Sequence, residues 1–353
     1  MKKIAKSIFV IMGVCSMLWV ASVTQAVTLP NGAGNTYKVP SYHQPEEEIV
    51  TTSKNGVQYT YEFRDSKKTS INILKIETEK KKLVIPAKLD GCSVYQISGP
   101  NFESAATVKT VIIQNGVKEI GDGAFAYQNQ LESVVIPKSV KKIFRDAFLD
   151  NVKLKKIKFQ NSSIKIGEDA FIGCINLQKI SFPQGEFTGE IGKGAFEYCD
   201  LRNLELPYMK NMRKQVGQFA FAENKNLKRV TFSSRNRNIY LGAGCFSDCP
   251  KAQIIVGKQV KTFSSKVQAK SGTVRLLGSQ TRLTGFKKPK GRTYYYIQFK
   301  KFIVPKNSKA LKILRNAEYG TVRETWKRGY VDDPYYYFST SEADMHKVKV
   351  VIK

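Results

Sequence analysis

A hexapeptide with apolar residues at both of its ends recurs along the middle of the chain. Each copy begins with an aliphatic residue and ends with a small residue followed by phenylalanine. The copies are residues 120–125, 143–148, 166–171, 191–196, 216–221 and 241–246. Their phenylalanines are 23, 23, 25, 25 and 25 residues apart, and a weaker copy at 97–102 lies 23 residues upstream. A fixed period of this length predicts a repeat protein whose units pack on one another.

A short run of alternating apolar and polar residues begins five or six residues after most of these phenylalanines. The runs are residues 131–137, 154–159, 177–183, 201–207 and 227–232. Alternation with a period of two predicts a β-strand, so each unit should supply one strand. We expect Phe125, Leu131, Val134 and Ile136, with their equivalents in other units, to point inward and stack from coil to coil. The prediction is a mainly β solenoid of about seven 23–25-residue units, with short helical or irregular turns.

The full repeat pattern, Ile-Gly-x-x-Ala-Phe-x-x-Cys-x-x-Leu-x-x-Ile-x-Ile-Pro, resembles the BspA-type leucine-rich repeat of bacterial surface antigens. The resemblance covers about residues 56–260. It implies a leucine-rich repeat solenoid with an N-terminal cap, carried by a secreted, non-enzymatic binding protein. It also implies that Cys174, Cys199 and Cys249, three residues after phenylalanine, pack in the core. Phe144 departs from the pattern at a position that usually holds glycine.

The two ends of the chain lack the repeat. Residues 1–26 have a basic start, an apolar stretch and a small-residue end, which predicts a signal peptide cleaved after Ala26. The alternative is a membrane anchor, but about 14 apolar residues are fewer than the roughly 20 that a spanning helix needs. Residues 27–55 read as a linker, and the strict alternation of residues 57–63 predicts a strand of the cap. Residues 261–353 are expected to form a small, basic, aromatic-rich β module.

Few residues of the chain suggest catalysis. The histidines are His43 and His346, far apart in the sequence, so no metal, cofactor or nucleophile–base site is predicted. The cysteines that remain after cleavage are Cys92, Cys174, Cys199, Cys245 and Cys249. Five is an odd and sparse number for a disulfide framework, which favours buried thiols. We therefore predict a non-enzyme without a cofactor, and a cell-wall hydrolase is the less favoured alternative.

The net charge is strongly positive and unevenly distributed. Lys and Arg total 58 against 29 Asp and Glu. Residues 251–353 hold 23 of the basic and 6 of the acidic residues, a balance of about +17. Such a block favours an anionic partner, and outside a bacterial cell we expect an anionic wall polymer rather than a specific nucleic acid.

Two groups of residues are candidates for ligand binding. The first lies on the outward positions of the repeat strands, where neighbouring strands about 4.8 Å apart bring basic side chains together; it comprises Lys156, Lys158, Lys179 and Arg229. The second mixes aromatic and basic residues that are able to stack on sugars and neutralise phosphate; it comprises Tyr294, Tyr296, Lys300, Lys301, Trp326, Lys327, Arg328 and Tyr330. The alternative for the first group is a solvated sheet face, and the alternative for the second is an ordinary β core.

These observations predict a secreted or non-covalently surface-associated binding protein, adhesin-like by the family resemblance. Its partners would be a protein or glycan on a host or neighbouring cell and an anionic cell-wall polymer, with no transmembrane segment left after signal cleavage. The alternative is a structural protein that assembles with itself and has no dedicated ligand.

Overall fold

The computed structural model describes residues 48–99, 107–240, 243–264 and 272–284, and then residues 295–296, 301–315, 317–322, 327–328, 337–338, 343–347 and 349–353. Within the chain, Glu47–Lys353 forms one compact unit. The expected signal peptide and most of the expected linker lie outside the described residues, as does the weak repeat copy at 97–102 beyond residue 99.

The N-terminal cap is an antiparallel arrangement of three strands, β1 (Ile49–Lys54), β2 (Val57–Phe63) and β3 (Ser70–Glu77). Asn55 and Gly56 join β1 to β2 with φ angles of 52° and 66°, the left-handed values that a tight hairpin turn requires and that Asn-Gly supplies. The cap therefore begins at Ile49, so the last residues of the predicted linker, 49–55, belong to the cap. The Asn-Gly pair was the signal that would have placed β1.

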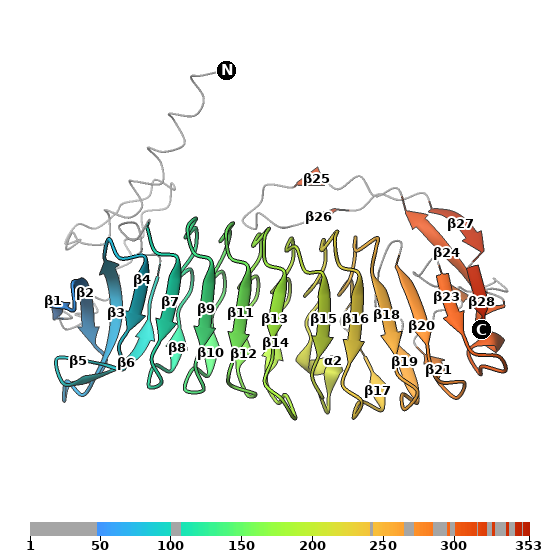
Figure 1. Ribbon diagram of the computed structural model, residues 1–353, viewed down its shortest axis with the longest axis horizontal. Helices are drawn as coiled ribbons and strands as arrows, with labels where there is room; N and C mark the ends of the chain where they lie inside the picture. Colours follow the sequence, from blue (N-terminus) through green and yellow to red (C-terminus); the bar gives the residue numbers. More distant parts are fainter. Residues whose placement is uncertain are drawn as a thin grey trace, which may run out of the picture. The chain divides into compact units, whose positions relative to one another are not determined.

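The first wall of the solenoid is a five-stranded parallel sheet in the order β13-β11-β9-β7-β4. Its strands are β4 (Lys82–Ile85), β7 (Thr110–Ile113), β9 (Ser133–Ile136), β11 (Lys156–Phe159) and β13 (Lys179–Ser181). Each lies one repeat after its neighbour, and they stand side by side in Figure 1. Three of them, β9, β11 and β13, lie within the alternating runs of the sequence.

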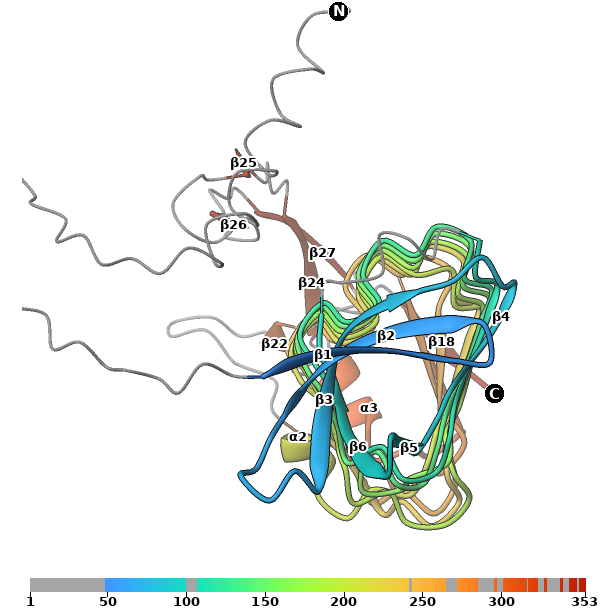
Figure 2. The same ribbon diagram turned by 90° about the vertical axis from the view of Figure 1, so that its left-hand side faces the viewer.

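A second wall runs along the same coils and continues the cap sheet. It contains β5 (Lys88–Leu89), β6 (Cys92–Ile97), β8 (Glu119–Ile120), β10 (Lys142–Ile143), β12 (Lys165–Ile166) and β14 (Glu190–Ile191). The isoleucine that opens each hexapeptide ends one of the short strands β8, β10, β12 and β14. Viewed end-on, the successive coils nearly superimpose (Figure 2).

The parallel sheets resume after a short interruption and continue past residue 260. One has the order β15-β16-β18-β20-β23-β28, and the other is β17-β19-β21. Their strands are β15 (Asn203–Leu206), β16 (Arg229–Phe232), β17 (Asn238–Ile239), β18 (Gln253–Val256), β19 (Thr262–Ser264), β20 (Thr273–Leu276), β21 (Arg282–Thr284), β23 (Lys301–Val304) and β28 (Lys349–Ile352).

The sheet thus crosses the domain boundary that we expected at residue 260. All four residues of β18 pair with β20, and β23 and β28 follow in the same ladder. Val274, Leu276 and Phe302 are buried in the same core as the repeats. Residues after 260 therefore supply further coils of the solenoid, rather than only a separate β module. They escaped detection because no Ala-Phe hexapeptide occurs after residue 246.

The remaining described elements are short. They are the helices α2 (Met212–Gln215) and α3 (Leu311–Leu314), a sheet of β22 (Tyr295–Tyr296), β24 (Ala317–Val322) and β27 (Ala343–Lys347), and the pair β25 (Lys327–Arg328) and β26 (Tyr337–Phe338).

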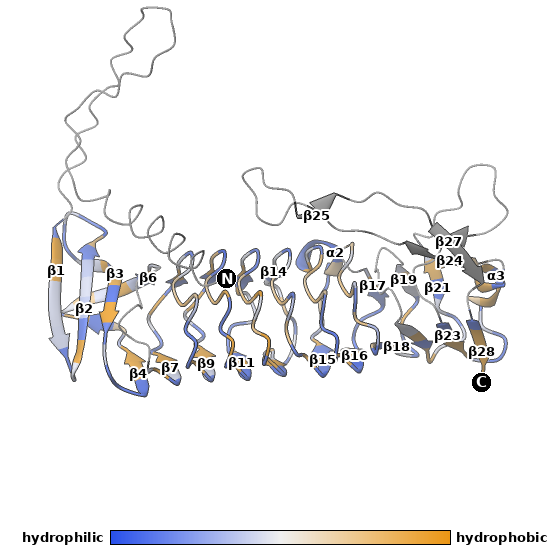
Figure 3. Ribbon diagram, turned by 90° about the horizontal axis from the view of Figure 1, so that it is seen from above, coloured by the Kyte–Doolittle hydropathy of each residue, from blue (hydrophilic) through white to orange (hydrophobic). Residues whose placement is uncertain are grey.

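The core is built around a column of stacked phenylalanines, one from each hexapeptide. Ring centroids are 5.0 Å apart for Phe125 and Phe148, 4.8 Å for Phe148 and Phe171, and 5.0 Å for Phe171 and Phe196. The column continues through Phe221 to residue 246 at 5.6 Å per step. Because every ring is completely buried, no unit can bury its own phenylalanine without a neighbour. Hydrophobic and hydrophilic residues alternate along the coils accordingly (Figure 3).

The residue three positions after phenylalanine links each coil to the one before it. The side chain donates a hydrogen bond to the carbonyl oxygen of the preceding coil's phenylalanine. The pairs are Asn151 to Phe125 (2.7 Å), Cys174 to Phe148 (3.3 Å), Cys199 to Phe171 (3.3 Å), Asn224 to Phe196 (2.9 Å) and Cys249 to Phe221 (3.3 Å). The three cysteines are buried, as the family resemblance implies, and their thiols take the place of an asparagine amide.

Candidate binding surface

The two long parallel sheets are the first wall and the sheet β15-β16-β18-β20-β23-β28. Their outward positions form two rows of side chains that run from coil to coil. The first residue of each strand pairs with the first residue of the next, so Lys156 lies between Ser133 and Lys179. Beyond the interruption, Arg229 lies between Asn203 and Gln253, and the row continues through Thr273 to Lys301 and Lys349. The second row holds the third residue of each strand.

Basic side chains recur along these rows. Lys82 lies on the edge strand β4, and the others are Lys156, Lys158, Lys179, Arg229, Arg275, Lys301 and Lys349, which we name the basic sheet face. Among the outward strand positions that the structure describes, the acidic residue is Glu205. The buried neighbours Ile157, Ile180 and Val230 fix the orientation, because alternate residues of a strand point to opposite sides.

The structure brings three of the predicted site residues together. Lys156 and Lys179 are direct partners across β11 and β13, and Lys158 is two residues along β11. All three are exposed. Arg229 is also exposed but lies on the second long sheet, and Lys301 is half-buried two strands beyond β18. Arg275 and Lys349 were missed by sequence reasoning because their coils had not been recognised.

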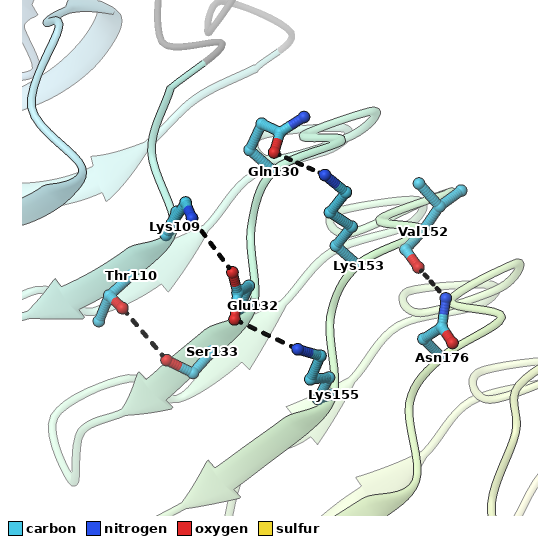
Figure 4. A network of polar contacts seen from close by, with 9 residues as sticks. All are labelled: Lys109, Thr110, Gln130, Glu132, Ser133, Val152, Lys153, Lys155 and Asn176. Atoms are coloured by element: carbon cyan, nitrogen blue, oxygen red, sulfur yellow. Dashed lines mark hydrogen bonds and ion pairs between the residues drawn. The ribbon is translucent and has the colours of Figure 1, made fainter.

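The lysines immediately upstream of these strands have a different environment. Glu132 lies between Lys109 and Lys155, with carboxylate-to-ammonium distances of 3.7 and 3.4 Å (Figure 4). The hydrogen bond and charge of Lys155, together with Lys109, lower the pKa of Glu132. Lys165 likewise pairs with Glu190 and Lys193 with Glu168.

No such ion pair holds Lys156, Lys158 or Lys179 within the described part of the chain. Like charges on neighbouring strands repel one another, which disfavours the sheet unless a counter-charge is supplied. The face therefore presents positive charge that an external anion is able to neutralise.

An insertion interrupts the face between β13 and β15. Phe187 is buried there, and its carbonyl oxygen accepts a hydrogen bond of 2.6 Å from the side-chain amide of Gln215 in α2. Glu186 bridges Tyr208 in a parallel arrangement at the same place. The two long sheets follow each other along one side of the solenoid, as Figures 1 and 2 show. The basic sheet face therefore consists of two patches.

Half of the second candidate group lies outside the described residues. This applies to Tyr294, Lys300, Trp326 and Tyr330. Tyr296 belongs to β22, and Lys327 and Arg328 form β25, which pairs with β26. The suggested aromatic and basic cluster at this end stays a prediction.

A row of buried carboxyl groups lies on the turns at the phenylalanine end of the coils. Burial, followed by the charges of Glu168 and Asp146, raises the pKa of Asp169 to about 6. Burial, followed by the charges of Asp169 and Glu223, raises the pKa of Glu197 to about 8. Glu197 therefore keeps its proton at neutral pH, whereas Asp169 loses its proton near pH 6, which links the stability of the turns to pH. Across the described residues, no group of three or more metal-ligating side chains is positioned to hold a metal ion.

The repeat also matches a known family. A family model described as the BspA type leucine-rich repeat region, in six copies, matches residues 95–215 and 142–275, which together span just over half of the chain. The chain belongs to the BspA-type leucine-rich repeat family. The match extends to residue 275, in agreement with the coils that the structure shows beyond residue 260.

Several solved structures of leucine-rich repeat proteins are similar to this BspA-type chain. A T. pallidum leucine-rich repeat protein is 25% identical with a TM-score of 0.48, covering 55% of this chain and 87% of its own. A leucine-rich cell surface protein from Faecalibacterium prausnitzii is 16% identical with a TM-score of 0.39, covering 77% and 95%. The pneumococcal vaccine antigen PcpA is 14% identical with a TM-score of 0.37, covering 76% and 96%. Among curated proteins, none matches this sequence.

Membership of the family supports a surface or binding role for the chain. In the part of the chain that the structure describes, none of the helices has the length and apolar character to cross a membrane.

Proposed function

We propose that this BspA-type protein is exported and acts at the cell surface as a non-enzymatic binding protein, and that its basic sheet face binds an anionic envelope polymer. The observation that carries the proposal is the uncompensated charge of Lys156, Lys158 and Lys179 beside lysines that are paired. A polymer with one negative charge per repeating unit is suited to this face, because Lys156 and Lys179 lie side by side on adjacent strands.

The binding would be largely electrostatic. Each lysine or arginine that neutralises a phosphate or carboxylate of the polymer releases the counterion bound there, so retention should fall steeply as ionic strength rises. The excess of basic residues after Lys251 would extend the same attraction toward the C-terminal coils through Arg275, Lys301 and Lys349. Protein or glycan ligands of other cells are compatible with the same surface, and the test below distinguishes them.

The test compares two triple variants with the same loss of charge. One replaces Lys156, Lys158 and Lys179 with glutamine; the other replaces the ion-paired lysines Lys109, Lys155 and Lys165. Retention of the purified protein on immobilised poly(glycerol phosphate) is measured against salt, with uncharged dextran as the blank. We expect the first variant to elute at clearly lower salt and the second to elute near the wild type.

An equal loss of retention in both triple variants would mean that net charge alone drives retention. Unchanged retention of the first triple variant would exclude the basic sheet face from the binding site. Binding to dextran that is indifferent to salt would favour a neutral glycan ligand instead.

A further inference from the structure

A second surface lies where the cap meets the first coil, at the edge strand β4 of the first wall. A groove of about 460 Å³ separates the tip of the β1–β2 hairpin from β4. Its lining combines apolar side chains, including Tyr59, Val84 and Pro86, with polar residues, most of them lysines. A volume of this size is within the range of about 300–1,000 Å³ that is usual for ligand sites.

The strand that lines the groove is the free edge of the first wall. β4 pairs with β7 on one side and is the last strand of its sheet on the other. The amide of Thr110 donates to the carbonyl oxygen of Lys81 at 3.1 Å, and that of Gln114 donates to Ile85 at 3.0 Å. Because alternate residues of a parallel strand face the same neighbour, Lys82 and Val84 direct their backbone groups to the open side.

Part of this edge is already engaged by the cap. The hydroxyl of Tyr59 donates to the carbonyl oxygen of Val84 at 3.2 Å. Among the described residues, no hydrogen bond reaches the backbone N–H of Val84 or either backbone group of Lys82. The side chain of Val84 is 40% exposed, although Leu83 and Ile85 on either side are fully buried. An exposed edge with free donors and an apolar side chain is a template for one more strand.

The charge around the groove indicates the character of that strand. Lys54, Lys80, Lys82 and Lys88 line it, and among the residues that the structure describes no aspartate or glutamate does. The ammonium of Lys54 donates to the carbonyl oxygen of Lys88 at 3.1 Å, and that of Lys80 donates to the carbonyl oxygen of Asn55. These neutral acceptors satisfy hydrogen bonds but leave the positive charge uncompensated.

We propose that this groove binds an extended acidic peptide segment of a partner protein, which adds to β4 as a further strand of the first wall. Main-chain hydrogen bonds to Lys82 and Val84 supply the register. Alternate acidic side chains reach the surrounding lysines, and the residues between them pack on Val84 and Tyr59. A peptide fits better than a polymer of phosphates, because the free edge offers donors and acceptors in the alternation of a β-strand.

The probe is a blocked seven-residue peptide of alternating glutamate and valine, measured by fluorescence anisotropy with the purified full-length protein. Two comparison peptides complete the set, one with lysine in place of glutamate and one with alternate backbone nitrogens methylated. We expect the first peptide to bind at least tenfold more tightly than either of the others. Methylation removes the donors of a pairing strand without changing its charge.

Variants of the protein test the two halves of the argument. Val84→Pro removes one outward N–H, which an edge strand tolerates, and Lys82→Gln with Lys88→Gln removes two charges. Each should weaken binding of the acidic peptide about tenfold or more. The control variant Lys156→Gln with Lys158→Gln removes the same charge elsewhere and should change the affinity for this peptide less than twofold. Thermal unfolding confirms that each variant is folded.

Three outcomes would overturn the proposal. Equal binding of the methylated peptide would show attraction by charge without strand addition. Equal weakening by the control pair of lysine variants would place the peptide on the basic sheet face. Absence of binding at millimolar peptide, with the wild-type protein folded, would exclude the groove as a peptide site.

Discussion

The rings of Phe148 and Phe171 lie 4.8 Å apart and are tilted by 9° from parallel. They belong to consecutive coils, 23 residues apart in the sequence, so this contact joins units that share no local interaction. Aromatic rings usually prefer offset or edge-on contacts, and Phe159 supplies such an edge-on contact to Phe171 at 6.0 Å. A near-parallel pair at 4.8 Å is within the centroid range that aromatic pairs favour, so each step of the column adds to the energy of burial.

Replacing Phe171 with alanine should strongly destabilise the protein. The ring is fully buried and stacks on Phe148 and Phe196 at once, and truncation of a buried phenylalanine typically costs about 3–5 kcal/mol. The measurement is the free energy of unfolding from urea denaturation. Ile175→Ala, at a residue 57% exposed on the next turn, is the control and should leave the midpoint nearly unchanged. A small effect at Phe171 would contradict the stacked column.

The hydrogen bond from each coil to the preceding phenylalanine predicts that replacing asparagine at this position costs more stability than replacing cysteine. The amide of Asn224 donates to the carbonyl oxygens of Phe196, Phe221 and Ala222, and its oxygen accepts the amide of Leu201 at 3.0 Å. Asn224→Ala leaves buried polar groups unsatisfied, so we expect a loss of at least about 1–3 kcal/mol.

Cys199→Ala at the equivalent position should cost less, because a thiol is a weak donor and Cys199 makes fewer contacts of this kind. Urea denaturation of both variants measures the difference. A larger loss for Cys199→Ala would mean that side-chain volume, rather than hydrogen bonding, decides this position.

The repeat period was sufficient to predict the solenoid and its core. The spacing of Phe125, Phe148 and Phe171 places one ring per coil, and the structure stacks them as expected. Recognition by the Ala-Phe motif failed for coils built without it. Thr273 lies only 20 residues after its partner Gln253, so these coils are shorter than the repeats from which the period was taken.

The charged surface was predictable only in part. Alternation along the strand places Lys156 outward, and the period places Lys179 beside it. The pairing of Lys155 with Glu132 depends on long side chains crossing between coils, which residue spacing alone does not decide. The distinction between paired and uncompensated lysines therefore required the structure.

The buried carboxyl groups predict that stability falls as pH rises. The pKa of Glu197 is raised from an ordinary 4.5 to about 8, so between these values the folded state keeps a proton that the unfolded state loses. The free energy of unfolding should decrease through this window, by at most about 1.4 kcal/mol per pH unit for one group. Asp169, raised from 3.8 to about 6, acts in the same direction at lower pH.

Glu197→Gln should flatten this dependence, because glutamine is neutral in both states. The measurement is the urea midpoint at several values between pH 5 and 8 for the wild type and the variant. Glu190→Gln, at an exposed carboxylate paired with Lys165, is the control and should retain the wild-type slope. An unchanged slope in Glu197→Gln would show that this carboxyl does not hold its proton in the folded state.

Removing the acidic residue between two lysines should strengthen retention on an anionic polymer. Glu132 holds Lys109 and Lys155 in ion pairs that cross three coils, and Glu132→Gln would release both ammonium groups next to Lys156. The released lysines are then able to contact the polymer and displace its counterions, so the protein should elute from poly(glycerol phosphate) at higher salt. Glu190→Gln makes the same change in net charge on the second wall and should shift elution less. An equal shift in the two variants would mean that the polymer responds to total charge and not to the basic sheet face.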